Sequence, residues 1–471
     1  MNLFIKSIAI VTLFSFSCSA NPARFTHSDK EKSDASVKVE DLNLAPLELL
    51  EKPPAVSVGD QKNGIKSYQI GNLTLIHKNT PNNPVVAARL YLDGGVAGVN
   101  ESTEGLDQFA MLVAVNGGSQ TTPKNEFNTI LDGIGASVYS FSDPDYSGYG
   151  LRTLAENIDA SWPLFVQSVM EPAMPEDEIT FTREQQLASI ANRGESPDSQ
   201  VSEAVKELLF KDHPYRFHLN GNAKSVNSFT RSQLISRQRE MLNNKSLLLV
   251  VVGNLDAADL LERVKASFAK IASTPKEKKK LNAFTTGATF TSVQKPLPTH
   301  YILGYYPAPS PDHEDYATML IATSYLYDRL FEEVRTKRNL TYAVSAGLSA
   351  RKQNYGYLYV TAVDVPTTMK VIFDQVAELK VLEIPKSDLE ETVNVFITSY
   401  YRSLETNGDQ ASFLAKWHLK TGSWINSQTI LERIKHVTPT DIQRVSAKYF
   451  NNYRFAVVGK TKPDPALFSG N

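Results

Sequence analysis

Residues 105–118 read Gly-Leu-Asp-Gln-Phe-Ala-Met-Leu-Val-Ala-Val-Asn-Gly-Gly. Upstream of this stretch, the segment from Val85 to Leu92 alternates between apolar and other residues, as strands do. Asp93-Gly94-Gly95 then gives a turn signal. The segment from Ser67 to His77 alternates in the same way. We therefore expect a globular body that begins near Ile65 and reaches residues 105–118 through strands.

The sequence contains an internal repeat. Residues 228–254 read SFTRSQLISRQREMLNNKSLLLVVVGN, and residues 437–460 read VTPTDIQRVSAKYFNNYRFAVVGK. Each copy has a threonine cap, an amphipathic helix, Asn-Asn and a hydrophobic strand that ends in Val-Val-Gly. The closing glycines, Gly253 and Gly459, lie 206 residues apart (459 minus 253). This spacing is long for a solenoid and indicates a duplicated domain of about 200 residues.

A proline followed by a charge run separates the two copies. The stretch Thr274-Pro275-Lys276-Glu277-Lys278-Lys279-Lys280 indicates an interdomain linker over residues 274–287. Folded domains are then expected at 61–273 and 288–465. Residues 21–60 are largely polar and charged, which predicts a flexible lead-in. Strand runs and helix runs are grouped within each domain, which favours an α+β sandwich.

The length and composition of the chain narrow the classes of protein. A chain of 471 residues is too long for one ordinary hydrophobic core, so two or more domains are expected. Hydrophobic residues make up 42% and aromatic residues 10%, which supports packed globular domains. A formal net charge of −2 argues against a nucleic-acid-binding protein, which usually has a basic excess.

The first twenty residues have the order of a secretory signal. Met1 to Ser7 carries Lys6, Ile8 to Phe16 is mostly apolar, and Ser17-Cys18-Ser19-Ala20 consists of small residues. We therefore expect residues 1–20 to be a signal peptide, and the protein to be periplasmic, or a membrane-anchored lipoprotein, in a Gram-negative-type bacterium.

Cys18 is the only cysteine of the chain, so the mature body has no internal disulfide. Two interpretations of Cys18 stay open. It is either the lipidated first residue of a lipoprotein or part of a signal that is cleaved after Ala20. The preceding Ser15-Phe16-Ser17 lacks the leucine usual in lipoprotein signals.

Residues 105–118 resemble the active-site helix of the pitrilysin-type (M16) zinc peptidases, roughly Gly-x-x-His-Phe-x-Glu-His-Met-x-x-x-Gly-Thr. In such a helix, positions i, i+3 and i+4 share one face. Two histidines there bind Zn²⁺, and the glutamate handles the proton of the metal-bound water. This chain has Gln108 and Leu112 at the histidine positions and Met111 at the position of the catalytic glutamate. None of the three can take over these roles.

The resemblance extends over roughly residues 65–465, and its landmarks stand in order. Val85 to Gly95 looks like the strand and turn before the active-site helix. Residues 210–215, Phe-Lys-Asp-His-Pro-Tyr, look like the recurrent His-Pro segment of the family, and Gly253 and Gly459 close the two repeats. The resemblance implies two homologous M16-type α+β sandwich domains in tandem, which form half of a clam-like chamber.

The third zinc ligand of the family is a glutamate farther along the chain, in a Glu-Glu-Ile context. The corresponding stretch here is Gln186-Leu187-Ala188-Ser189-Ile190, and both candidate positions, Ala188 and Ser189, lack a carboxylate. Glu184 lies about one helical turn upstream, but without the histidines it has no site to complete. All three ligands and the catalytic base are therefore absent together, and no metal site is expected in this chain.

The remaining histidines do not form a replacement motif. None of them pair at i, i+3 or i+4; they are His27, His77, His213, His218, His300, His313, His418 and His436. His213 and His218 are five residues apart, with Pro214 between them, which spoils a shared helix face. A site assembled from distant residues stays open as an alternative.

Residues 334–346 read Val-Arg-Thr-Lys-Arg-Asn-Leu-Thr-Tyr-Ala-Val-Ser-Ala. They resemble the segment of the M16 C-terminal domain in which an Arg and a Tyr seven residues later help to bind the substrate backbone at the zinc site. The matching residues are Arg335 and Tyr342. A guanidinium and a phenol are donors that can stabilise an oxyanion. The plain alternative is a surface Arg on a helix and a Tyr that starts a strand.

One segment departs from the family pattern. Family members usually carry a Leu-Gly-Gly turn shortly before a Ser-Arg-Leu segment. Residues 323–330 here read Thr-Ser-Tyr-Leu-Tyr-Asp-Arg-Leu, with no glycine pair. We therefore expect a shorter loop near Arg335 than in the family.

Three hypotheses follow for the function. In several M16 branches one chain of a heterodimer carries the zinc motif and the other carries the Arg/Tyr pair. The first hypothesis is therefore a non-catalytic subunit of an exported heterodimeric M16 zinc metalloendopeptidase that degrades peptides, with Zn²⁺ in a partner that bears His-x-x-Glu-His. The second is an inactive peptide-binding or scaffold protein of the cell envelope. The third is a peptidase with relocated chemistry, for which no Gly-x-Ser-x-Gly elbow is found.

Overall fold

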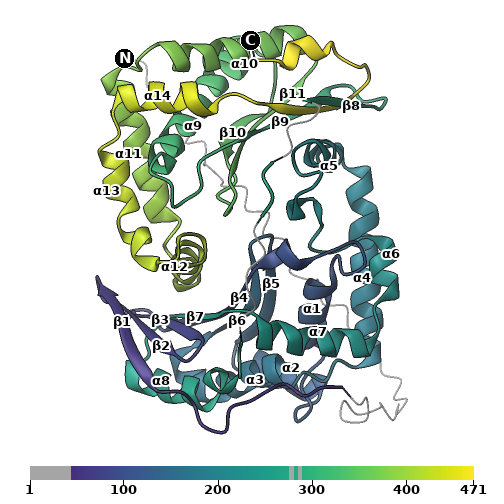
Figure 1. Cartoon of the computed structure of the whole chain (residues 1–471), viewed down its shortest axis with the longest axis vertical. Helices are drawn as coiled ribbons and strands as arrows, with labels where there is room; N and C mark the ends of the chain where they lie inside the picture. Colours follow the sequence, from purple (N-terminus) through teal and green to yellow (C-terminus); the bar gives the residue numbers. More distant parts are fainter. Residues whose placement is uncertain (1–43, 275–280, 285–288, 471) are drawn as a thin grey trace.

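The computed structural model describes residues 44–274, 281–284 and 289–470, which form two α+β units (Figure 1). The predicted signal peptide 1–20, with Cys18, lies outside the described residues, as do most of the lead-in 21–60 and most of the linker 274–287.

The N-terminal unit contains a seven-stranded sheet in the order β1-β2-β3-β7-β4-β6-β5. Its strands are β1 (Val56–Lys62), β2 (Ile65–Ile70), β3 (Leu73–Asn79), β4 (Val85–Asp93), β5 (Ser137–Asp143), β6 (Tyr146–Leu154) and β7 (Leu247–Gly253). Its helices are α1 (Leu106–Asn116), α2 (Lys124–Gly133), α3 (Ile158–Met170), α4 (Glu176–Glu195), α5 (Pro197–Leu209), α6 (Ala223–Ser228), α7 (Arg231–Asn244) and α8 (Ala257–Ala266).

The C-terminal unit contains a five-stranded sheet in the order β10-β11-β9-β12-β8. Its strands are β8 (Phe290–Gln294), β9 (His300–Pro307), β10 (Val344–Leu348), β11 (Tyr355–Ala362) and β12 (Arg454–Gly459). Its helices are α9 (Tyr316–Leu330), α10 (Val365–Val381), α11 (Lys386–Arg402), α12 (Asn407–Thr421), α13 (Ile430–Lys435) and α14 (Pro439–Tyr449).

The two sheets repeat one topology. β7 pairs parallel with β3 and antiparallel with β4, and β12 pairs in the same two ways with β8 and β9. The helix before each of these strands begins at a threonine, and Thr230 and Thr438 both form a capping box. The repeat seen in the sequence is therefore a repeat in space, with β1 and β2 added to the N-terminal sheet.

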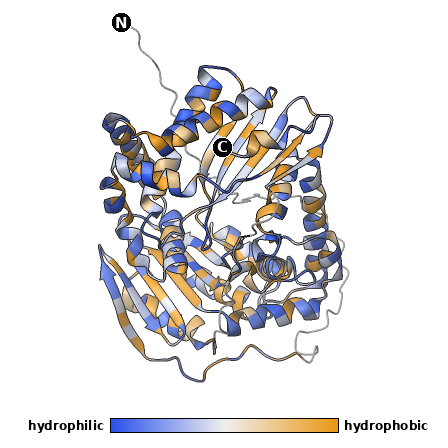
Figure 2. Cartoon of the chain, turned by 45° about the horizontal axis from the view of Figure 1, so that its top comes forward, coloured by the Kyte–Doolittle hydropathy of each residue, from blue (hydrophilic) through white to orange (hydrophobic). Residues whose placement is uncertain are grey.

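The central strands are apolar at consecutive positions because helices cover both of their faces. In β7, Leu247, Leu249 and Val251 face the core beneath α1, α3, α7 and α8. The alternate residues, Leu248, Val250 and Val252, pack instead with α12 of the other unit. Figure 2 shows apolar residues along the strands of both sheets.

Each unit lends one helix to the other. α12 of the C-terminal unit covers the N-terminal sheet through Ala411, Leu414 and Ala415. α5 of the N-terminal unit covers the C-terminal sheet, where Val205 and other residues pack with strands β9 and β12. Both helices lie between the two sheets in Figure 1. The interface between the units is therefore hydrophobic core rather than a loose contact.

Two local features differ from the sequence-based expectations. β1 occupies residues 56–62, so an edge strand already begins within the stretch 21–60 expected to be a flexible lead-in. The alternating segment from Ser67 to His77 is a hairpin of β2 and β3. Its turn lies at Gly71, whose φ of +58° favours glycine. Among the described residues, none of the helices has the length and apolar character needed to cross a bilayer.

Candidate functional site

The first turn of α1 is locked against the loop before α6. Gly105 caps the helix with a φ of +87°, and a Cβ atom there would lie 2.6 Å from the Cα of Gly221. The adjacent Glu104 is buried, and its Oε1 accepts a hydrogen bond of 2.7 Å from the backbone N–H of His218. Its Oε2 accepts a second bond, of 2.5 Å, from Nδ2 of Asn222. A glycine is therefore required at position 105 by both backbone conformation and close approach.

The residues at the three zinc-motif positions lie in different surroundings. Gln108 is half-buried and lines an open hollow of about 300 Å³, together with Ser142, Ser147 and His218. Met111 is fully buried in the N-terminal core, and Leu112 is partly buried. α1 thus lines the hollow with the amide of Gln108 and with the carboxylate of Asp107, which is already paired with two cations.

A zinc ion does not fit this set of residues. Within residues 44–274, 281–284 and 289–470, no three His, Cys, Asp or Glu side chains converge as a metal site would require. The charged residues at the hollow are already engaged. Asp107 pairs with Arg237 at 2.7 Å and with Lys245 at 3.2 Å, and His218 Nε2 lies 2.6 Å from Glu203. These pairs stabilise the fold around α1.

The pKa values of the two carboxyl groups agree with this structural role. Burial by itself raises the pKa of Asp107, but the positive charges of Lys245 and Arg237 outweigh it and lower the pKa. Burial also opposes ionisation of Glu203, yet hydrogen bonding from His218 and the charge of Lys206 lower its pKa to about 2. Both groups are therefore anions at neutral pH, and neither is poised as a general base.

The stretch expected to match the third zinc ligand lies on α4, beside the same loop. Ser189 is exposed, and its Oγ lies 3.4 Å from Nδ2 of Asn220. Gln186 is buried and donates a hydrogen bond of 2.7 Å to the backbone oxygen of Asn220. Ala188 is exposed. α1 and α4 thus meet at Asn220 and Gly221, and the two candidate positions for the third ligand, Ala188 and Ser189, carry a methyl group and a hydroxyl.

Arg335 and Tyr342 lie in the other unit, on the connection between α9 and β10. Arg335 belongs to a π-helical turn, Phe331–Thr336, that continues α9. Its guanidinium carbon lies 4.7 Å from the ring centroid of Phe331, and its side chain is exposed. Tyr342 is 84% exposed. Across the described parts of the chain, no hydrogen bond, ion pair or ring contact joins either side chain to α1. The side chains of Arg335 and Tyr342, both hydrogen-bond donors, are therefore exposed on this connection.

An ionic contact joins the two units near the hollow, and no local sequence pattern predicts it. The connection between β10 and β11 reaches the N-terminal sheet, where Arg351 pairs with Asp143 at 2.5 Å and Lys352 pairs with Asp93. The backbone N–H of Lys352 also donates to Asp145 at 2.9 Å. Asp143 lines the hollow that Gln108 lines. The C-terminal unit thus closes one side of the degenerate site.

Two family models match the chain in succession. The model described as Insulinase (Peptidase family M16) matches residues 74–222, and the one described as Peptidase M16 inactive domain matches residues 228–396. This chain belongs to peptidase family M16. The predicted resemblance is confirmed, and so is the α+β fold with two M16 domains in tandem.

Curated M16 relatives match most of the chain at low identity. An uncharacterized zinc protease of Rickettsia felis is 24% identical over 388 residues, which are 81% of this chain and 93% of the relative. An uncharacterized zinc protease of Mycobacterium leprae is 24% identical over 343 residues, 70% of this chain and 77% of the relative.

Solved structures share the fold of this chain. A peptidase M16 inactive domain from Pseudomonas fluorescens superposes with a TM-score of 0.74 at 19% identity, over 87% of this chain and all of that one. The periplasmic protease PqqL of Escherichia coli gives a TM-score of 0.74 at 13% identity. That match covers 94% of this chain but 49% of PqqL. This M16 chain therefore has the fold of about half of PqqL.

Proposed function

We propose that this chain is the non-catalytic subunit of an exported heterodimeric M16 zinc metalloendopeptidase that degrades peptides. A partner subunit with a His-x-x-Glu-His helix supplies Zn²⁺ and the base. This chain supplies Arg335, Tyr342 and half of an enclosed chamber. The observation that carries the proposal is a contrast within the chain. α1 has no metal ligands at positions 108, 111 and 112, whereas Arg335 and Tyr342, on the connection between α9 and β10, are exposed.

The chemistry of the two side chains fits this role. A guanidinium and a phenolic O–H donate hydrogen bonds, and donors aimed at a developing oxyanion stabilise the transition state of peptide hydrolysis. Gln108 and Met111 leave this chain without the metal that polarises the peptide carbonyl. Arg335 and Tyr342 can therefore act in peptide hydrolysis only when another chain brings the metal to them. An enclosed chamber restricts the substrate to peptides or unfolded segments.

The size of the chain supports assembly with a second M16 unit. The chain has the fold of 49% of PqqL, so two such units together match that protein in extent. The order of residues in the N-terminal segment, with a basic start and an apolar run before Cys18, supports export to the periplasm, with or without a lipid anchor.

The test is recovery of the tagged full chain from its native cell envelope under mild conditions. We expect a stoichiometric partner that bears His-x-x-Glu-His, about one zinc per pair, as in a single catalytic zinc site, and peptide cleavage that a chelator abolishes. A protein recovered without such a partner, free of zinc and inactive on peptides would overturn the proposal.

Substitution of the donors gives a sharper test of this chain's contribution. In the assembled complex, Arg335→Ala is expected to lower kcat by about 100- to 1000-fold, because one donor to the oxyanion is lost. Tyr342→Phe removes only the hydroxyl and is expected to act in the same direction. Arg402→Ala, at an exposed arginine of α11, is the matched control and should leave kcat unchanged. Full activity of the Arg335→Ala complex, at unchanged subunit stoichiometry, contradicts the role of Arg335.

A second candidate function is a binding or scaffold protein of the envelope that does not cleave peptides. One observation favours it: a chain of complex III from Candida albicans has the same fold, with a TM-score of 0.71 over 88% of this chain and 99% of that one. The same recovery experiment separates the two functions. A stable assembly that lacks both zinc and peptidase activity supports the scaffold.

A further inference from the structure

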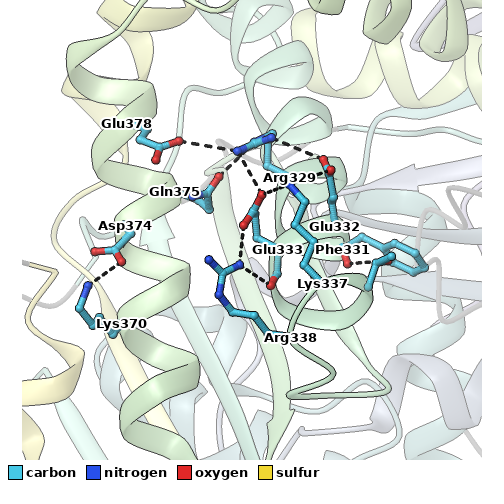
Figure 3. A network of polar contacts seen from close by, with 11 residues as sticks. Arg329, Phe331, Glu332, Glu333, Lys337, Arg338, Lys370, Asp374, Gln375 and Glu378 are labelled. Carbon is cyan, nitrogen blue, oxygen red and sulfur yellow. Dashed lines mark hydrogen bonds and ion pairs between the residues drawn. The ribbon is translucent and has the colours of Figure 1, made fainter.

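Glu333 is the charge centre of the turn that carries Arg335. It lies two residues before Arg335 in the π-helical turn Phe331–Thr336, and it is 7% exposed. Three cations converge on its carboxylate: Lys337 Nζ at 2.6 Å, Arg338 Nη1 at 2.5 Å and Arg329 Nη2 at 3.5 Å (Figure 3). A buried carboxylate with three cationic partners is fully engaged.

Two of these partners, Arg338 and Arg329, make further contacts that brace the turn. Arg338 Nη1 donates a second bond, of 2.9 Å, to the backbone oxygen of Glu333. Arg329 donates to Gln375 at 3.0 Å and lies 3.8 Å from Glu378, both on α10. The turn is therefore braced from the segment that follows it and from the helix beside it, as Figure 3 shows.

The second carboxylate of the turn is occupied as well. Glu332 pairs with Lys337 at 3.0 Å and with Arg329 at 3.5 Å. Both carboxylates of the turn are therefore taken by cations other than Arg335. The guanidinium of Arg335 rests on the ring of Phe331 at 4.7 Å instead. Without this occupation, the nearest carboxylate would attract Arg335 back onto its own turn.

We propose that Glu333 is a positioning residue: by gathering Lys337, Arg338 and Arg329, it fixes the turn and leaves Arg335 with no carboxylate partner within the described part of the chain, presented to an incoming chain. The same bracing fixes the start of the segment that leads to Tyr342. Its far end is anchored by Thr341, which is buried and whose Oγ1 lies 3.0 Å from Oγ1 of Thr361 on β11. The inference rests on the proposed function of Arg335.

Glu333 remains ionised near neutral pH, so its ion pairs with the three cations persist there. Hydrogen bonds from Lys337 and Arg338 lower the pKa of Glu333 to about 2. The carboxylate therefore holds its charge over the whole range in which a peptidase assay is practical. An effect of its substitution should accordingly be independent of pH between about 5 and 8.

The test is kinetic and uses the complex assembled with its partner. Glu333→Gln keeps the shape of the side chain and removes its charge. We expect kcat to fall about 10-fold or more, because a small displacement of a donor weakens its contact with the transition state. We expect KM to change less than about twofold, since most substrate contacts are untouched. Glu390→Gln, at an exposed glutamate of α11, is the matched control and should keep kcat within about twofold.

A double-mutant cycle distinguishes positioning from a general structural effect. If Glu333 acts through Arg335, Glu333→Gln combined with Arg335→Ala lowers kcat no further than Arg335→Ala alone. If the two losses multiply, or if Glu333→Gln retains full kcat, the inference is overturned. Glu333→Asp keeps the charge, so it serves as the second variant if Glu333→Gln prevents assembly, and it should retain part of kcat. An assembled Glu333→Asp complex whose kcat is no higher than that of Glu333→Gln also overturns the inference. An Arg335→Ala complex with full activity defeats the proposed function itself, which is a different outcome.

Discussion

At the scale of single residues, Met111 is a core side chain of α1. The side chain is fully buried in the core that the sheet and the helices share. The apolar neighbours on the helix, Phe109, Ala110 and Val113, are also fully buried. A thioether is well suited to such a site because it fills irregular space without needing a hydrogen bond. The position that the M16 resemblance assigns to the catalytic base is therefore a packing position in this chain.

Met111→Glu is therefore expected to destabilise the protein by about 3–4 kcal/mol, since it buries a carboxylate with no cation beside it. Met111→Leu preserves volume and polarity and is expected to cost about 1 kcal/mol or less. Urea denaturation of the two variants against the parent measures both values. Equal stability of Met111→Glu and the parent protein would show that α1 exposes this position to solvent.

At the scale of elements, the two exchanged helices determine how the domains hold together. α5 and α12 each leave their own sheet and cover the other, so neither sheet has a complete core without the other domain. Leu209, at the last turn of α5, is fully buried against the C-terminal sheet. Removing apolar volume at this interface should therefore weaken both domains together.

Leu209→Ala is expected to cost about 2–4 kcal/mol, the range for a buried leucine whose cavity closes only in part. Glu207→Ala, two residues earlier on the same helix and exposed, is the control and is expected to change stability by less than about 0.5 kcal/mol. Denaturation should remain a single transition in both variants, because the interface is shared core. Two separated transitions in Leu209→Ala would mean that the domains fold independently.

At the scale of the whole molecule, the sequence predicted the duplicated domain but not the exchange of helices between the two domains. The threonine caps and the Val-Val-Gly endings led correctly to the matched strands β7 and β12, since local periodicity records which residues face inward. Periodicity does not record which sheet an apolar helix face will meet, so the exchange of α5 and α12 was missed. The pairing of Arg351 with Asp143 joins residues 208 apart (351 minus 143), which no local pattern can indicate.

The candidate site, like the fold, could be predicted from the sequence only in part. Gln108, Met111 and Leu112 could be predicted from the sequence as the residues at the zinc-motif positions, because those positions have a fixed spacing on one helix. The contacts of Glu333 could not be ranked, because a run of charged residues looks the same whether its members are solvated or gathered on one buried carboxylate. Burial decides that difference, and burial comes from the packing of α9 on α10.

The interface between the domains also contains a cluster of buried charged groups, and this gives the molecule a pH response. The N-terminal domain contributes Asp143 and Asp145, and the C-terminal domain contributes Arg351, Lys416 and Lys420. Burial lowers the pKa of Lys420 to about 8, although the two aspartates oppose the shift. Its ammonium group donates to the backbone oxygen of Ala350 in the β10–β11 connection. A charged lysine at this place therefore costs stability in its folded surroundings.

The sign of this pH response depends on whether the folded protein or the unfolded chain binds the proton of Lys420 more tightly. Below pH 8, Lys420 is charged in both states, and the full cost of burying that charge is present. Between about pH 8 and 10.5 the folded protein has released the proton while the unfolded chain still binds it, so the free energy of unfolding rises with pH. We expect a contribution from Lys420 of about 1–2 kcal/mol between pH 7.5 and 9.5, measured by urea denaturation at each pH. Lys420→Met should lack this contribution, whereas Lys370→Met, at a lysine that is 74% exposed, should keep it. An identical pH profile for Lys420→Met and the parent protein would mean that the ammonium group remains solvated at the interface, and that the two domains open there more than their shared core implies.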